Sequence, residues 1–178
     1  MNIIHKSIYI TLNMIIINKS GYLKFNKHKF RCALGKEGVG KKKTEGDNIT
    51  PKGIFKITKI YYRQDKIKKI KTLIKKIKIR KKMGWCDDPR SIFYNKQIKL
   101  PSKFSYERLY RKDHIYDLLA VLNYNINPVV KNKGSAIFIH IATKNYRPTA
   151  GCVALKQKDL IKLLQIIKKN TKIKISAA

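Results

Sequence analysis

Acidic residues are scarce in this sequence. Asp and Glu number 10 against 42 Lys and Arg, so the 178-residue chain carries a formal net charge of +32. A field of this sign favours anionic partners such as nucleic acid, an acidic polymer or a membrane surface. The basic residues are spread along the whole chain, however, and no recognition motif with interleaved aromatic residues accompanies them. We therefore attribute the charge to compositional drift and expect no specific nucleic-acid site.

Cysteine is also rare, and the three thiols of Cys32, Cys86 and Cys152 lie far apart in the sequence. No CxxC pair occurs and no histidines stand at zinc-finger spacing, which argues against a structural zinc site. We expect no metal. An odd number of cysteines leaves at least one thiol free even if the other two pair, so a free, reactive cysteine is a working hypothesis.

Long apolar runs are missing as well. No uninterrupted apolar stretch of about 18 residues occurs, so we predict no transmembrane segment. The N-terminal sequence MNIIHKSIYITLNMIIINKS is interrupted by His5, Lys6, Thr11 and Asn13, and no small-residue cleavage site follows it. We therefore do not expect a signal peptide.

The length and the 43% hydrophobic content suffice for one domain with its own core, and we predict a single domain over residues 1–178. Short β-branched or aromatic runs bounded by turn signals predict strands. These runs cover residues 7–17, 28–34, 54–62, 115–124, 135–141 and 172–175. A long loop is expected from Gly35 to Gly53, and the Ile/Lys alternation of residues 66–82 fits neither a helix nor a strand well enough to choose between them.

After Cys152 the apolar residues recur at helical spacing, with lysines between them, and predict an amphipathic helix. The apolar positions are Leu155, Leu160, Ile161, Leu163, Leu164, Ile166 and Ile167. Strands therefore dominate, and we predict a mainly β fold with one or two helices. No internal repeat is visible.

The segment GKEGVGKK, from Gly35 to Lys42, is close to a phosphate-binding loop. It has Lys42 where such a loop needs Ser or Thr to coordinate magnesium. It is also followed by Gly46, Pro51 and Gly53 instead of the helix whose N-terminus would hold the phosphates. We therefore expect no nucleotide cofactor.

His140 and Cys152 form a second constellation. A thiol must lose its proton to attack a carbonyl, and a nearby imidazole can take that proton and return it to a leaving amine. Such pairing would move the reactivity of the thiol below the pH range set by a free cysteine, whose pKa is about 8.5. A packed core cysteine and a strand-end histidine explain the same spacing, so the spacing alone decides nothing.

The run PTAGCVAL, from Pro148 to Leu155, resembles the signature of the L,D-transpeptidase (YkuD-type) catalytic domain. Four further stretches resemble motifs of that family in the same order: EGDNITPKGIF (Glu45 to Phe55), GWCDDP (Gly84 to Pro89), YN (Tyr94 and Asn95) and GSAIFIHIA (Gly134 to Ala142). The resemblance extends from about residue 32 to residue 164. It implies a β-rich sandwich or barrel and a cysteine enzyme that takes an acyl group from a peptidoglycan stem peptide and passes it to an amine.

The resemblance also implies roles for individual residues. Cys152 would be the nucleophile that forms the thioester, His140 the general base and then acid, and Gly151 part of the backbone that holds the oxyanion. Ala150 and Ala154 stand where many members carry His and Arg, so those two side chains are not carried over. The pair is similar to the branch of the family that also carries GWCDDP.

Four residues are candidates for substrate binding: Thr149, Arg147, Trp85 and Tyr94. Each has a structural alternative, since Thr149 can support a turn, Arg147 can be an ordinary surface charge, and the two aromatic residues can be packing residues. Cys86 stands beside two aspartates, whose negative charge would raise the pKa of its thiol. It is therefore a poorer nucleophile candidate than Cys152.

The implied partners are peptidoglycan stem peptides, and the charge adds an anionic cell-envelope polymer as a second expectation. The family would place the chain in the periplasm or cell envelope. No cofactor is implied. Two alternatives stay open: hydrolysis of the same acyl-enzyme by water, which makes a carboxypeptidase or amidase, and a non-catalytic basic module that binds anionic polymer or nucleic acid through counterion release.

Overall fold

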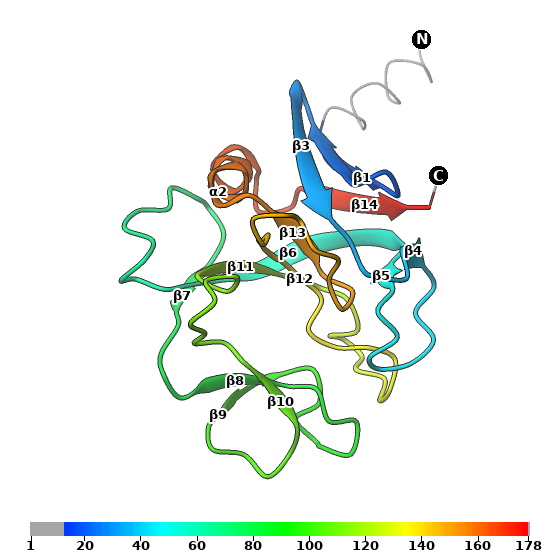
Figure 1. Cartoon of the computed structure of the whole chain (residues 1–178), viewed down its shortest axis with the longest axis vertical. Helices are drawn as coiled ribbons and strands as arrows, with labels where there is room; N and C mark the ends of the chain where they lie inside the picture. The colour runs from blue at the N-terminus through cyan, green and yellow to red at the C-terminus, as the bar shows by residue number, and fades with distance from the viewer. Residues whose placement is uncertain (1–12, 178) are drawn as a thin grey trace.

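The computed structural model describes residues 13–177. Its first three strands form an antiparallel meander (Figure 1). They are β1 (Met14–Asn18), β2 (Tyr22–Phe25) and β3 (His28–Ala33). Alternate residues of β1 are buried, with Ile15 and Ile17 fully enclosed, because successive side chains of a strand point to opposite faces. The predicted hairpin is confirmed, whereas residues 7–12 of the predicted first strand lie outside the described residues.

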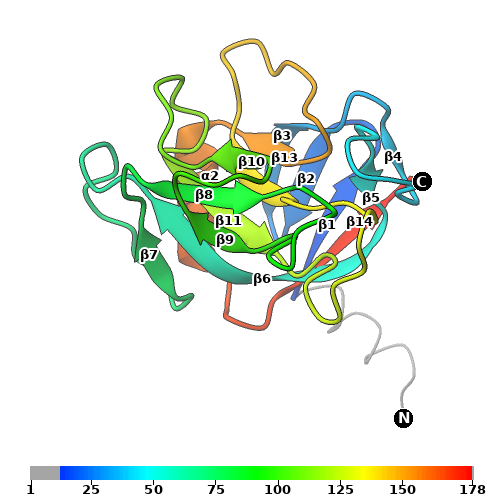
Figure 2. The ribbon, with the colours of Figure 1, turned by 90° about the horizontal axis from the view of Figure 1, so that it is seen from below.

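These strands belong to a nine-stranded sheet that closes on itself. The other members are β6 (Gly53–Tyr62), β7 (Lys76–Lys78), β11 (Leu118–Leu122), β12 (Phe138–Ile141), β13 (Val153–Leu155) and β14 (Lys172–Ser176). The strand order is β11-β12-β13-β3-β2-β1-β14-β6-β7, and β6 also pairs with β11. The long strand β6 makes closure possible, because its first half pairs with β14 and its second half with β11. The result is the barrel-like arrangement seen in Figure 1 and Figure 2.

One helix, α2 (Gln157–Ile166), occurs among residues 13–177. It buries Leu160, Leu163 and Leu164, which share one face at helical spacing. These leucines join the larger hydrophobic core together with strand residues such as Ile139 and Val153. The amphipathic helix predicted after Cys152 is therefore confirmed.

A second, three-stranded sheet lies apart from the closed sheet, at the bottom of Figure 1. It consists of β10 (Tyr106–Arg108), β8 (Met83–Cys86) and β9 (Gln97–Lys99), in that order. The sequence analysis does not predict these strands, because each is only three or four residues long. Within the predicted long loop, β4 (Val39–Gly40) and β5 (Thr50–Pro51) form a short parallel pair.

Residues 66–82, which the sequence leaves undecided, are mostly irregular and contain only β7 as a regular element. Ile67, Ile70 and Ile74 are buried in the larger core, and most of the lysines between them are exposed. The three isoleucines therefore hold a basic loop against the domain. The expected class, mainly β with one helix in the described part of the chain, is confirmed. None of the described helices is long and apolar enough to cross a membrane.

Candidate functional site

Two neighbouring parallel strands bring His140 and Cys152 to the same face of the sheet. In the register of β12 and β13, His140 lies opposite Ala154, and Cys152 precedes Ala154 by two residues. Alternation therefore places the Cys152 and His140 side chains on one face. Burial agrees, since Phe138 and Cys152 belong to one hydrophobic cluster while Ile139 lies in the larger core on the other face.

The turn before Cys152 is held by Thr149. Its Oγ1 donates to the carbonyl of Cys152 at 2.6 Å and accepts the Gly151 N–H at 3.1 Å. Gly151 has φ +129°, and a Cβ atom there would lie 2.8 Å from the carbonyl oxygen of Ile49. Glycine is therefore required at position 151 by both conformation and space. Thr149 supports the turn and also lines the cavity described below.

The Cys152 thiol is buried and hydrogen-bonded to the backbone. Its Sγ donates to the carbonyl of Ala136 at 3.0 Å and accepts the N–H of Phe138 at 3.3 Å. Ala136 adopts φ +52°, an unusual left-handed conformation for a residue with a Cβ. Burial raises the pKa of Cys152 well above its ordinary value, with a smaller contribution from the charge of Glu107.

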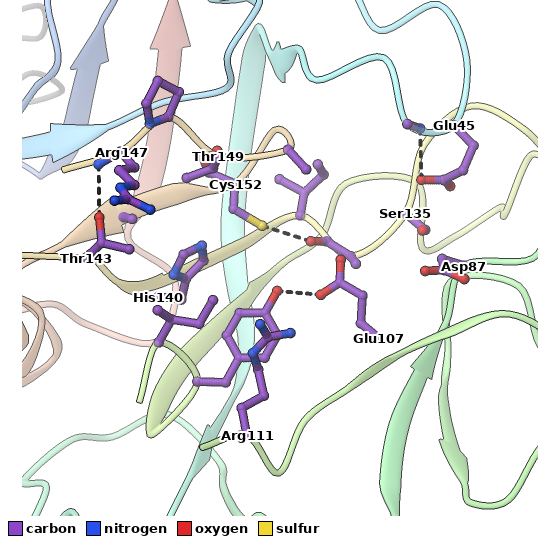
Figure 3. Close-up of a pocket in the computed structure, with 18 of the residues that line it drawn as sticks. Glu45, Asp87, Glu107, Arg111, Ser135, His140, Thr143, Arg147, Thr149 and Cys152 are labelled. Atoms are coloured by element: carbon purple, nitrogen blue, oxygen red, sulfur yellow. Dashed lines mark hydrogen bonds between the residues drawn. The ribbon is translucent and has the colours of Figure 1, made fainter. Parts of the chain in front are cut away.

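His140 is held in one tautomer by its own strand. Its Nδ1 lies 2.9 Å from the carbonyl oxygen of Ile141, and a carbonyl can only accept, so Nδ1 carries the hydrogen. Nε2 is then the free basic nitrogen. Burial lowers the pKa of His140 to about 4, and the ring of Tyr116 packs edge-on against the imidazole at 5.3 Å between centroids. In Figure 3 the imidazole and the Cys152 side chain lie in the same cavity.

These shifts run opposite to the expectation from pairing alone. The thiol has a raised pKa and the imidazole a lowered one, so the unliganded site holds a neutral thiol beside a neutral imidazole at pH 7. Burial, which disfavours the charged thiolate, is the largest cause of the raised Cys152 pKa. The expected reactivity of the thiol at lower pH stays a prediction.

The cavity above the pair has a volume of about 620 Å³, within the range of small-molecule sites. Its charged lining residues are Lys42, Glu45, Asp87, Glu107, Arg111 and Arg147. In Figure 3, Arg147 lies on the side of His140, and Glu45 and Asp87 lie together on the opposite side of Cys152. Arg147 is exposed and its backbone N–H donates to Thr143 Oγ1 at 2.9 Å.

Trp85 and Tyr94, two of the candidate substrate-binding residues, are buried and are not among the lining residues of this cavity. The Trp85 indole donates to Asn95 Oδ1 at 2.9 Å, and the same oxygen accepts the N–H of Ala136 at 3.0 Å. The Tyr94 hydroxyl donates to the carboxylate of Glu45. Both aromatic residues therefore pack behind the residues that line the cavity. Asn95 links Trp85 to the backbone of Ala136, whose carbonyl oxygen accepts the hydrogen bond from Cys152.

The other two cysteines lie away from the site. Cys32 is in the larger core, where burial raises its pKa to about 12, and Cys86 is fully buried in a third small cluster. All three cysteines are free. Of the three, Cys152 alone is among the lining residues of the cavity.

Several lining residues were not identified as site residues from the sequence: Asp87, Glu107, Arg111, Tyr116 and Ser135. Asp87 and Ser135 stand inside the motifs GWCDDP and GSAIFIHIA, which is a signal that could have indicated them. Glu107, Arg111 and Tyr116 belong to no motif. Only the pairing of β10 with β8 brings Glu107 to the cavity.

The profile of the L,D-transpeptidase catalytic domain (YkuD) matches residues 13–175, which is nearly the whole chain. The chain belongs to the YkuD L,D-transpeptidase catalytic domain family. No curated protein sequence matches it.

Several solved structures are similar to this chain at low sequence identity. Bd1075 of Bdellovibrio bacteriovorus is 18% identical with a TM-score of 0.50, and the match covers 93% of this chain and 48% of that one. The helical cell shape determining protein Pgp2 of Campylobacter jejuni is 16% identical with a TM-score of 0.45, covering 92% and 47%. L,D-transpeptidase 1 of Mycobacterium tuberculosis is 12% identical with a TM-score of 0.40, covering 91% and 60%. This chain thus spans about half the length of the first two proteins.

Proposed function

We propose that this chain is a cysteine-dependent acyltransferase that acts on peptidoglycan stem peptides and transfers the acyl group to an amine. The observation that carries the proposal is that His140 on β12 and Cys152, which immediately precedes the adjacent strand β13, line one cavity. Membership in the L,D-transpeptidase family supports the reaction class. The substrate is a peptide amide at an L-to-D centre.

In the first half of the reaction, Sγ of Cys152 attacks the scissile carbonyl while its proton passes to Nε2 of His140. The tetrahedral intermediate collapses, the C–N bond breaks, and His140 returns the proton to the departing amine. A thioester remains on Cys152. In the second half an acceptor amine attacks the thioester, His140 takes the amine's proton, and that proton passes to the departing thiolate.

The oxyanion needs N–H donors at the turn around Gly151. The N–H of Gly151 itself already donates to Thr149, so we assign the principal donor to the N–H of Cys152. Gly151 contributes by its φ of +129°, which lets the chain turn at this point. Thr149 holds that turn in place before the substrate arrives.

Intact-mass spectrometry after exposure to a stem tetrapeptide tests the proposal. The wild type should gain the mass of the tripeptide acyl group, and a carbapenem, which acylates family members at this thiol, should add its own mass. Cys152→Ala should show neither adduct. Cys32→Ala and Cys86→Ala are the matched controls and should retain both, because their thiols lie outside the cavity. Adducts on the Cys152→Ala protein would contradict the assignment.

Chromatography of the released products identifies the acceptor. Cross-linked dimer formed with a second stem peptide supports amine transfer. Free tripeptide alone would show that water is the acceptor and that the chain is a carboxypeptidase.

A further inference from the structure

The segment from Lys66 to Lys82 is the most positively charged part of the chain. Ten of its 17 residues are Lys or Arg and none is Asp or Glu, whereas the whole chain has 42 Lys and Arg in 178 residues. All ten basic residues are exposed. Within residues 13–177 none of the ten forms an ion pair with a carboxylate. The segment therefore presents positive charge to solvent that no carboxylate of the described chain neutralises.

Residues 66–76, here called the basic loop, make up most of the connection between β6 and β7. This connection projects from the closed sheet at the left of Figure 1 and Figure 2. Three buried isoleucines hold it against the larger hydrophobic core, namely Ile67, Ile70 and Ile74. Lys76 Nζ also donates to the carbonyl of Ile70 at 3.1 Å. The exposed lysines are therefore carried by a loop whose shape is fixed before a partner binds, which reduces the entropy cost of binding.

A depression of about 330 Å³ lies on the basic loop. None of the residues that line it is acidic, and Thr72 adds a hydroxyl to its wall. Ammonium and hydroxyl groups donate hydrogen bonds, whereas a phosphate group offers negative charge and acceptor oxygens. The depression is therefore complementary to a phosphate group. Four lysines line it, namely Lys68, Lys69, Lys71 and Lys76.

Leu73 adds an apolar group beside this depression. It follows Thr72 in the chain and is 77% exposed, whereas the next residue, Ile74, is 3% exposed. The N–H of Ile74 donates to Thr72 Oγ1 at 3.3 Å, which forms a turn around Leu73. A leucine side chain is more stable in an apolar phase than in water. An exposed leucine among exposed lysines therefore fits a partner that offers both phosphate groups and hydrocarbon.

We propose that the basic loop is a docking surface for a bilayer of anionic phospholipid. The lysines of the depression contact headgroup phosphates, and Leu73 enters the boundary between headgroups and acyl chains. A soluble polyanion such as nucleic acid would engage the lysines but would leave Leu73 in water, so the observations favour the bilayer. The inference goes beyond the proposed function and does not depend on it, because no residue of the basic loop lines the Cys152 cavity.

Cosedimentation of the full chain with lipid vesicles tests the lysines. Vesicles of equal parts phosphatidylglycerol and phosphatidylcholine should bind the wild type, and vesicles of phosphatidylcholine alone should not. The triple variant Lys68→Gln, Lys69→Gln and Lys71→Gln should bind the anionic vesicles about 100-fold more weakly, because each lysine near an anionic bilayer strengthens binding roughly fivefold.

A second triple variant is the matched control for charge. Lys52→Gln, Lys131→Gln and Lys133→Gln remove the same charge from exposed residues, and the segments that carry them lie at the right of Figure 1, away from the basic loop. This variant should lose no more than about threefold, because charges farther from the bilayer than the Debye length are screened. Equal losses in the two triple variants would overturn the proposal, since the net charge alone would then explain binding.

Leu73→Ser separates a bilayer from a soluble polyanion. It should weaken binding to the anionic vesicles about 5- to 20-fold, through the lost apolar contact, and leave binding to soluble polyphosphate unchanged. Leu73→Trp reports insertion directly, because the single tryptophan of the wild type, Trp85, is 2% exposed. Its emission should move to shorter wavelength with anionic vesicles only. Vesicle binding unchanged by Leu73→Ser, or emission of Leu73→Trp unchanged by vesicles, would overturn the proposal.

Acylation of Cys152 checks that the variants are folded. All the substituted residues are exposed and lie outside the cavity, so each variant should acylate within about twofold of the wild type. Vesicle binding and acylation are separate measurements. A wild type that binds anionic vesicles but is not acylated would support the docking surface and contradict the proposed reaction, and the reverse result would do the opposite.

Discussion

The Nδ1 atom of His140 lies 2.9 Å from the carbonyl oxygen of Ile141, its neighbour on the same strand. This contact fixes the tautomer of the imidazole and leaves Nε2 as the basic nitrogen. The ring is also buried, and burial disfavours its charged form. The contact therefore sets the tautomer of His140, and burial sets its charge state.

We predict that His140 makes the fold sensitive to mild acid. The pKa of His140 falls from 6.5 to about 4 on folding, so between these values the unfolded chain binds more protons than the folded one. Its stabilising contribution is complete above pH 6.5 and is lost as the pH falls toward 4, a total of about 3 kcal/mol. Urea unfolding of the wild type and His140→Gln over this range measures the effect. Identical pH dependence in the two proteins would refute it.

Gly151→Ala should destabilise the protein and abolish acylation. At φ +129° an alanine is strained, and its Cβ would lie 2.8 Å from the Ile49 carbonyl, so we expect a loss of about 2 kcal/mol or more. Gly38→Ala is the control, because Gly38 also has positive φ, +76°, but its added Cβ would meet nothing within 4 Å. It should cost about 1 kcal/mol and leave acylation intact. Urea unfolding and intact mass provide both readouts, and equal losses in the two variants would contradict the steric argument.

Asn95→Ala should affect the site from a distance. It removes the acceptor shared by the Trp85 indole and the Ala136 N–H, leaving two buried donors unsatisfied, at a cost of about 2 to 4 kcal/mol. Because the Ala136 carbonyl contacts Cys152, the acylation rate of the fraction that stays folded should also fall. Asn170→Ala, at an exposed position, should change neither unfolding nor acylation. Normal stability and rate in Asn95→Ala would remove this residue from the supporting network.

Raising the salt concentration should weaken polymer binding much more than it slows turnover of a peptide substrate. If the lysines reflect drift, raising the ionic strength should weaken association with an anionic cell-envelope polymer steeply, through counterion release. Cleavage of a short stem tetrapeptide should slow far less over the same range of salt concentration. Sedimentation with the polymer and product chromatography at matched salt concentrations measure the two effects. A parallel collapse of both would show that surface lysines position the substrate itself.

The local sequence pattern is enough to predict those strands and helices whose residues pack against the larger hydrophobic core. Alternating isoleucines specify β1, the leucine spacing specifies α2, and the PTAGCVAL run marks Cys152. The small sheet of β8, β9 and β10 could not be predicted in this way. Its strands are too short to show a period, and they exist only through pairing with one another.

The same division applies to the site. The sequence by itself determines which residues carry a thiol, an imidazole and a glycine, and the β-branched pattern that makes the fold mainly β. Tertiary structure decides that Cys152 and His140 are desolvated and neutral, since burial depends on what packs over both strands. It also decides that Glu45, Asp87 and Ser135 line the same cavity, because these residues lie in three segments far apart in the chain that only folding brings together.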